Sequence, residues 1–111
     1  MKPTMELIKE LIAGRAELDR IFIQAQPKTT AEADEVRALF GRTVELTRQI
    51  DTLIDAEIAA SLADMQKWTA ELAPITAELR SFAANIDGVV VALGLIDRLL
   101  QVVVAIVALI V

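Results

Sequence analysis

Cysteine, histidine and tyrosine are absent from the 111-residue sequence, and aromatic rings come from only three phenylalanines and one tryptophan. Without cysteine the chain forms neither disulfides nor thiolate metal sites, and without histidine it lacks the commonest general base and metal ligand. It also contains no glycine-rich phosphate loop, nucleophile elbow or zinc-ligand spacing. The sequence therefore predicts a protein that is not an enzyme and that carries no cofactor or metal.

Basic residues are outnumbered, with 11 Lys and Arg against 16 Asp and Glu and a net charge of -5. The basic residues are scattered, whereas binding nucleic acid requires a concentrated Lys and Arg surface. We therefore expect no nucleic-acid partner. A secretory signal is not expected at the N-terminus either, because Glu6, Lys9 and Glu10 interrupt what would be its apolar core.

Hydrophobic residues are abundant at 55%, and most are Ala, Leu, Ile or Val, which favours an all-α fold. Pro3 suits the first turn of a helix, and apolar residues at alternating steps of four and three follow it up to Ala25. Pro27 ends this helix, which we place at about residues 4–25. Thr29 and Glu32 have the spacing of a capping box, so a second helix is expected to begin there and fold back as an antiparallel hairpin.

The second helix has no strong stop signal, and we predict that it continues into the apolar C-terminal segment. Its apolar periodicity shifts in phase near Asp55, which we interpret as a stutter within one helix. The register then runs through Asn85-Ile86-Asp87-Gly88, a group whose composition is typical of a turn. We give periodicity more weight than composition, and we expect Pro74 to bend this helix.

An apolar seam follows one side of the long helix and repeats with heptad spacing. Its members are Ile58, Met65, Trp68, Leu72, Leu79, Phe82, Ile86 and Leu93. The first helix is about 33 Å long and covers only the beginning of the second, so the seam is expected to need another partner. A second copy of the chain, forming a coiled-coil or bundle homo-oligomer, is the simplest partner; an unidentified protein is the other.

The last 24 residues, from Gly88 to Val111, contain only three polar side chains, those of Asp97, Arg98 and Gln101. A helix of this length extends about 36 Å, enough to cross a bilayer core of about 30 Å. We therefore divide the chain into a charged helical region, residues 1–85, and a membrane-inserting helix, residues 86–111. Basic Lys67 and Arg80 precede the apolar segment, which places the N-terminal region in the cytoplasm.

Asp97 and Arg98 are costly in lipid, so they are expected to face a partner or water. Asp97 of one subunit could meet Arg98 of the next and set the register of the oligomer; a polar constriction in a channel and a soluble helix end are the alternatives. Insertion into one leaflet and burial in protein also remain open for the segment as a whole. Ala84, Gly88 and Ala92, spaced by four, match the small-residue pattern of closely packed membrane helices.

Together these features predict a membrane-anchored helical homo-oligomer that acts as a structural or scaffold component, with itself and the lipid bilayer as partners. One alternative is an α-helical pore former, such as a holin-like protein or small toxin. The other is a soluble helical bundle or filament subunit whose apolar tail is buried in a protein core.

Overall fold

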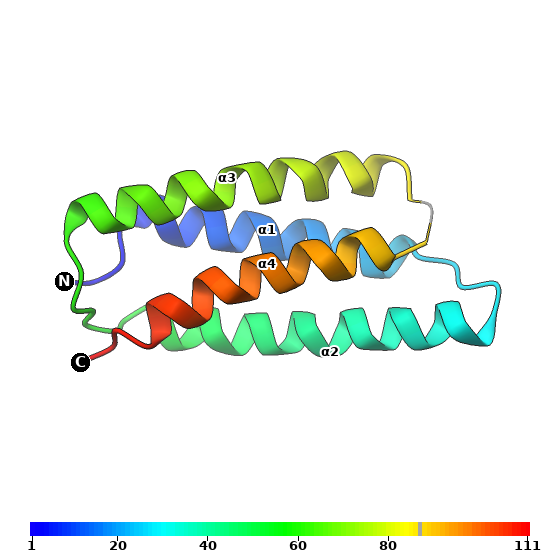
Figure 1. The fold of residues 1–111 in the computed structure, drawn as a ribbon, viewed down its shortest axis with the longest axis horizontal. Helices are drawn as coiled ribbons and strands as arrows, with labels where there is room; N and C mark the ends of the chain where they lie inside the picture. Colours follow the sequence, from blue (N-terminus) through cyan, green and yellow to red (C-terminus); the bar gives the residue numbers. More distant parts are fainter. Residues whose placement is uncertain (87) are drawn as a thin grey trace.

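The computed structural model describes residues 1–86 and 88–111, which form four helices (Figure 1). These are α1 (Met5–Gln24), α2 (Thr30–Leu53), α3 (Leu62–Ala84) and α4 (Val90–Val107). The all-α prediction is confirmed, and α1 and the start of α2 lie where the sequence predicted them. The Thr29 hydroxyl accepts a hydrogen bond from the Glu32 N–H at 3.1 Å, as its spacing predicted. The Glu32 carboxylate reaches one residue further back than expected and accepts from the Lys28 N–H.

The prediction of one long second helix is wrong, and the first break lies where the apolar phase shifts. Helix α2 ends at Leu53, and α3 begins after Ser61. The Ser61 hydroxyl accepts from the Asp64 N–H at 3.1 Å, and the Asp64 carboxylate accepts from the Ser61 N–H at 2.9 Å. This reciprocal capping box satisfies backbone N–H groups at the N-terminus of α3. The phase shift therefore marks the start of a new helix rather than a stutter within one helix. Pro74 lies inside α3, which continues through it.

The second break separates α3 from α4. The chain leaves α3 at Asn85, and Gly88 has a φ of +75°, a left-handed conformation that favours glycine. Asp87, the third member of the turn-like group, lies outside the described residues. The turn-like composition of this group predicted the break correctly, whereas the apolar periodicity did not. The heptad register crosses this break because α3 and α4 both turn their apolar stripes toward the same core.

The helices form two parallel pairs that run in opposite directions (Figure 1). Helix α1 packs most extensively on α3, and α2 packs most extensively on α4. Helices α2 and α3, although consecutive, are diagonal partners in the bundle, so residues 54–61 must cross its end. The molecule measures 46 × 22 × 17 Å, the proportions of one bundle of this length.

One hydrophobic core contains side chains from all four helices and from both regions into which the sequence was divided at residue 85. Four members of the predicted seam are buried in this core, namely Ile58, Met65, Leu72 and Leu79. The other four are half-buried against it, namely Trp68, Phe82, Ile86 and Leu93. The premise that the seam lacks a neighbour within the chain is therefore wrong, because α1 and α4 cover it. The homo-oligomer itself remains a prediction.

Both chain ends close the end of the bundle that residues 54–61 cross. The Met1 amino group donates to the Ile58 carbonyl at 2.7 Å, and the Ile58 N–H donates to the Met1 carbonyl at 3.0 Å. On its other side, Ile58 forms an antiparallel bridge with Ile110. This bridge is held by bonds from the Ala59 N–H to the Leu109 carbonyl and from the Val111 N–H to the Glu57 carbonyl.

Candidate functional site

The outer face of α4 combines exposed apolar side chains with charged ones. Six residues on the opposite side of this helix are buried in the core, namely Ala92, Leu95, Ile96, Leu99, Val103 and Ile106. We define the α4 outer face by eight residues that remain exposed: Val90, Val91, Gly94, Asp97, Arg98, Gln101, Val104 and Ala105. Its three valines have 62%, 57% and 50% of their surface exposed. The core is thus complete without these apolar side chains.

All three polar side chains of the apolar segment lie on this outer face, and two of them pair with flanking helices. Asp97 Oδ1 lies 3.2 Å from Arg42 Nε of α2, and Arg98 Nη1 lies 3.2 Å from Glu78 Oε2 of α3. All four side chains are between 38% and 55% exposed. Adjacent residues on a helix point about 100° apart, which is why Asp97 and Arg98 reach opposite neighbours. The two ion pairs thus border α4 on both sides.

The predicted close-packing trio does not share a helix face. Ala84 is the last residue of α3, Gly88 lies in the connection, and Ala92 is buried in α4. The close approach of helices occurs instead at Gly14, where an added Cβ would lie 2.8 Å from Leu99 Cδ1 and 3.5 Å from Thr76 Oγ1. Helices α1, α3 and α4 therefore meet at this glycine.

A second charged cluster joins α1 to α3. The Glu17 side chain, only 10% exposed, accepts from Arg20 at 2.8 Å and from Arg80 Nε at 3.4 Å. Sequence analysis missed it, although Glu17 lies one helical turn from the apolar positions Gly14 and Ile21 and so falls within their stripe. Its partner Arg80 is 63 residues away in the sequence, and no local pattern could identify it.

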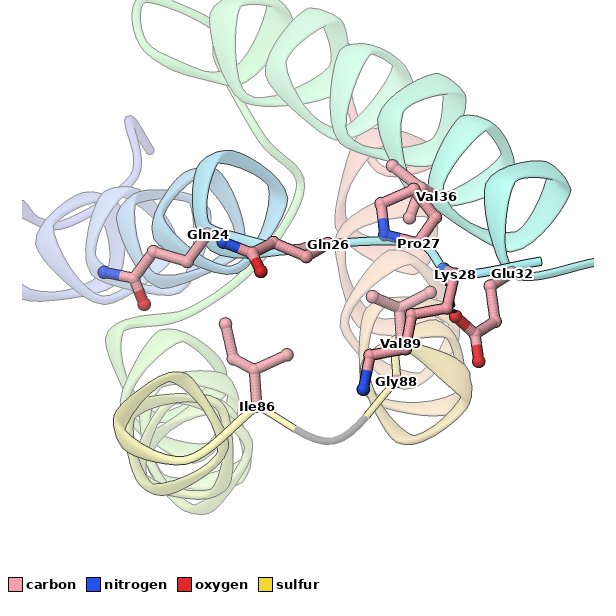
Figure 2. Close-up of a pocket in the computed structure, with 10 residues that line it drawn as sticks. Gln24, Gln26, Pro27, Lys28, Glu32, Val36, Ile86, Gly88 and Val89 are labelled. Atoms are coloured by element: carbon pink, nitrogen blue, oxygen red, sulfur yellow. Dashed lines mark hydrogen bonds between the residues drawn. The ribbon is translucent and has the colours of Figure 1, made fainter. Parts of the chain in front are cut away.

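One cleft lies at the other end of the bundle, between the α1–α2 turn and the start of α4 (Figure 2). It encloses about 230 Å³ between Pro27, Val36, Ile86 and Val89, with Glu32 at its edge. Ligand pockets usually enclose about 300 Å³ or more. The Glu32 carboxylate at its edge already accepts a hydrogen bond from the Lys28 N–H.

A smaller apolar groove follows the α1–α2 face. The Phe22 and Phe40 ring centroids lie 5.1 Å apart, and Val44 is 53% exposed beside them. In the part of the chain that the structure describes, no three acidic, histidine or cysteine side chains gather closely enough to hold a metal ion.

Comparison with known proteins adds no assignment: no protein-family model matches the sequence, and no significant match is found among curated proteins or solved structures.

Proposed function

We propose that this protein is a structural component that works by self-association, a four-helix bundle that presents the α4 outer face to a partner copy. The observation that supports this proposal is that the α4 outer face keeps three exposed valines on either side of its charged centre, although the core is filled without them. Exposed apolar surface of this kind on a folded chain is typical of a contact site for protein or membrane.

Comparison with α3 strengthens the case. The outer side of α3 carries exposed Gln66, Lys67 and Glu71, and most of its exposed apolar residues are alanines, the smallest apolar side chains. The exposed apolar residues of α4 are three valines, one glycine and one alanine, so α4 exposes larger apolar side chains than the alanines of α3. Since α4 already buries its inner stripe, folding of the single chain does not account for these outer valines.

The molecular mass of the full chain in detergent-free buffer tests self-association. We expect sedimentation velocity to give a monomer at low micromolar concentration and a larger, defined species as the concentration rises to ~200 µM. Far-ultraviolet circular dichroism should show high helicity at both concentrations, because each chain has its own core. A chain that stays monomeric at the highest concentration would overturn the proposal.

A membrane-anchored component is the second candidate, because one helix is long and apolar enough to span a membrane. Helix α4 has 18 residues with a mean hydropathy of 2.3, and 33% of them are buried in the bundle. Its length of about 27 Å approaches the thickness of a bilayer core. To cross a bilayer α4 must leave the bundle, which breaks the Arg42–Asp97 and Glu78–Arg98 pairs.

An engineered disulfide tests insertion directly. The Ile58–Ile110 bridge is a pair whose Cα atoms lie about 4.5 Å apart, within the range that a disulfide spans. In an Ile58→Cys, Ile110→Cys variant, the oxidised form ties the end of α4 to the loop that closes the bundle. If α4 spans the bilayer, the reduced form should float with liposomes and resist alkaline carbonate, and the oxidised form should not.

Equal behaviour of the two redox forms would overturn a membrane span. The cytoplasmic placement of the N-terminal region and a pore-forming role both depend on insertion, so ion conductance in liposomes is worth measuring only if the reduced form is extraction-resistant.

A further inference from the structure

We propose that two copies pair through their α4 outer faces in parallel orientation, around a twofold axis that runs alongside α4 and in its direction. The occupant of the face is a second copy of this chain. The inference rests on the proposed self-association, and it specifies the surface, the orientation and the residues in contact.

The exposed residues of α4 form a second seam, separate from the stripe that faces the core. Along the middle of the α4 outer face they recur at alternating steps of four and three residues, namely Val90, Gly94, Asp97, Gln101 and Val104. This is the spacing at which two helices pack side by side along their length. A helix of the same kind as α4 therefore fits this seam.

The charges of the face lie on opposite flanks of α4, and this decides the orientation. Asp97 leans toward α2, where Arg42 Nε lies 3.2 Å from its Oδ1. Arg98 leans toward α3, where Glu78 Oε2 lies 3.2 Å from its Nη1. A twofold axis parallel to α4 exchanges the flanks, so the α2 flank of one copy lies over the α3 flank of the other. Asp97 then lies beside the partner's Arg98, and the same contact occurs twice.

Each contact extends ion pairs that the single chain already has. The order across the interface is Arg42, Asp97, the partner's Arg98 and the partner's Glu78, so each charge lies next to one of opposite sign. The two Asp97 side chains point to opposite flanks and therefore diverge across the axis. In an antiparallel twofold pair the two α2 flanks would lie over each other, with Asp97 near the partner's Asp97, and like charges would repel.

The uncharged members of the seam also fit a parallel pair, in which residues of the same number lie opposite each other. Val90 and Val104 each meet the same valine of the partner and supply apolar contact. Gln101 meets the partner's Gln101, and an amide both donates and accepts hydrogen bonds. Nothing lies within 4 Å of a Cβ built on Gly94, which leaves room for the partner helix. The seam extends only about 21 Å, so we expect a dissociation constant of about 50 µM.

Single cysteines test the orientation directly, because the chain has no cysteine of its own. In a parallel pair, Val90→Cys and Val104→Cys each place two thiols on opposite sides of the axis, near the Cβ separation of about 4 Å that a disulfide requires. Val44→Cys is the matched control, at an exposed valine of α2 outside this face. Under mild oxidation, both α4 variants should form covalent dimers at least about tenfold faster than the control.

Mixing the two α4 cysteine variants separates parallel from antiparallel pairing. Trypsin cleaves after Arg98, between the two sites, so mass spectrometry of the linked peptides identifies which cysteines have paired. We expect links between two copies of the same variant and none between Val90→Cys and Val104→Cys. Links between the two variants would indicate an antiparallel pair and overturn the inference.

Charge reversal tests the contact of Asp97 with the partner's Arg98. Asp97→Lys gives each face two positive side chains and Arg98→Glu gives two negative ones, so each variant alone should dimerise at least about tenfold more weakly than the wild type. Mixed in equal amounts, they should form a heterodimer within about threefold of wild-type affinity, because both contacts again join opposite charges. Arg42→Ala and Glu78→Ala remove only the intrachain partners and should weaken dimerisation less. Circular dichroism verifies that every variant folds.

The outcomes distinguish this inference from the function on which it rests. If the wild type self-associates but neither α4 cysteine cross-links faster than Val44→Cys, the α4 pairing is overturned and self-association stands. The same conclusion follows if the two charge variants do not recover on mixing. A wild type that is monomeric at ~200 µM would overturn both proposals.

Discussion

At the scale of single residues, Thr76 stands out because its hydroxyl is buried without a hydrogen-bond partner. The residue is 3% exposed, and among the residues described its Oγ1 is the one buried side-chain polar atom that lacks a partner. Burying an unpaired polar atom costs free energy, whereas replacing it with an apolar group of the same shape removes that cost. We therefore expect Thr76→Val to raise the free energy of unfolding by about 1 kcal/mol.

Thr43 is the matched control for that measurement. It is 6% exposed, but its hydroxyl donates to the Leu39 carbonyl at 2.8 Å. Thr43→Val should therefore leave the free energy of unfolding unchanged or lower it. Urea unfolding measures the free energy of unfolding of both variants. An equal increase in the two would contradict the destabilising role given to the unpaired Thr76 hydroxyl.

Glycines inside helices give a second prediction. Whether Gly→Ala raises or lowers the stability of the fold depends on the space around each glycine. Gly41 is exposed with open space around an added Cβ, so Gly41→Ala should stabilise the chain by about 1 kcal/mol through helix propensity. At Gly14 the added methyl would lie 2.8 Å from Cδ1 of the buried Leu99, so the same substitution forces repacking. We expect Gly14→Ala to lower the melting temperature, and an increase like that of Gly41→Ala would contradict the close approach of α1 and α4.

At the scale of the helices, the capping box of α3 predicts a pH dependence. The hydrogen bond from the Ser61 N–H lowers the pKa of Asp64 most, and the bond with the Ser61 hydroxyl lowers it further, so that it lies below its ordinary value of 3.8. A carboxylate with a lowered pKa contributes stability that is fully present above the unfolded-state value and is lost as pH falls through the folded-state value. The difference in unfolding free energy between wild type and Asp64→Asn should therefore be largest above about pH 5 and disappear toward pH 2.

Ser61→Ala is the control for that prediction. It removes the hydroxyl partner of Asp64, so the pH dependence of the Asp64→Asn difference should become smaller in the Ser61→Ala background. If the difference in unfolding free energy between wild type and Asp64→Asn did not change with pH, the Asp64 carboxylate would not stabilise the fold through its hydrogen bonds with Ser61.

The helices also show how far sequence reasoning could go. Composition and the proline and capping signals located α1 and the start of α2, because those signals act within a few residues. The ends of α2 and α3 were missed since heptad periodicity reports which side of a helix is apolar, not whether the chain is continuous. Helices that return to one core keep related phases across their connections, as α3 and α4 do.

The site was predictable only in part, for a similar reason. The sequence identified Asp97 and Arg98 as the residues to explain, and their opposite directions follow from helix geometry. Their partners Arg42 and Glu78 lie on other helices, and the order in which four helices pack is decided by the whole core. The contact of Asp97 with Arg98 between copies remains a prediction.

At the scale of the whole molecule, the two chain ends lie at the same end of the bundle (Figure 1). Met1 and Ile110 pair with opposite sides of Ile58. Since neighbouring extended segments lie about 4.8 Å apart, the two termini are separated by about 10 Å, a gap that a short Gly and Ser linker can cross. The closure of this end therefore does not require free termini.

A circular permutant tests this closure. Joining Val111 to Met1 through about five Gly and Ser residues, with new termini opened in the exposed α1–α2 turn between Lys28 and Thr29, leaves all four helices and the residue 54–61 crossover intact. We expect the permutant to keep the helicity and cooperative unfolding of the parent. A permutant that loses cooperative unfolding would show that Met1 and Val111 do not both pair beside Ile58, and the diagonal crossover would need to be reconsidered.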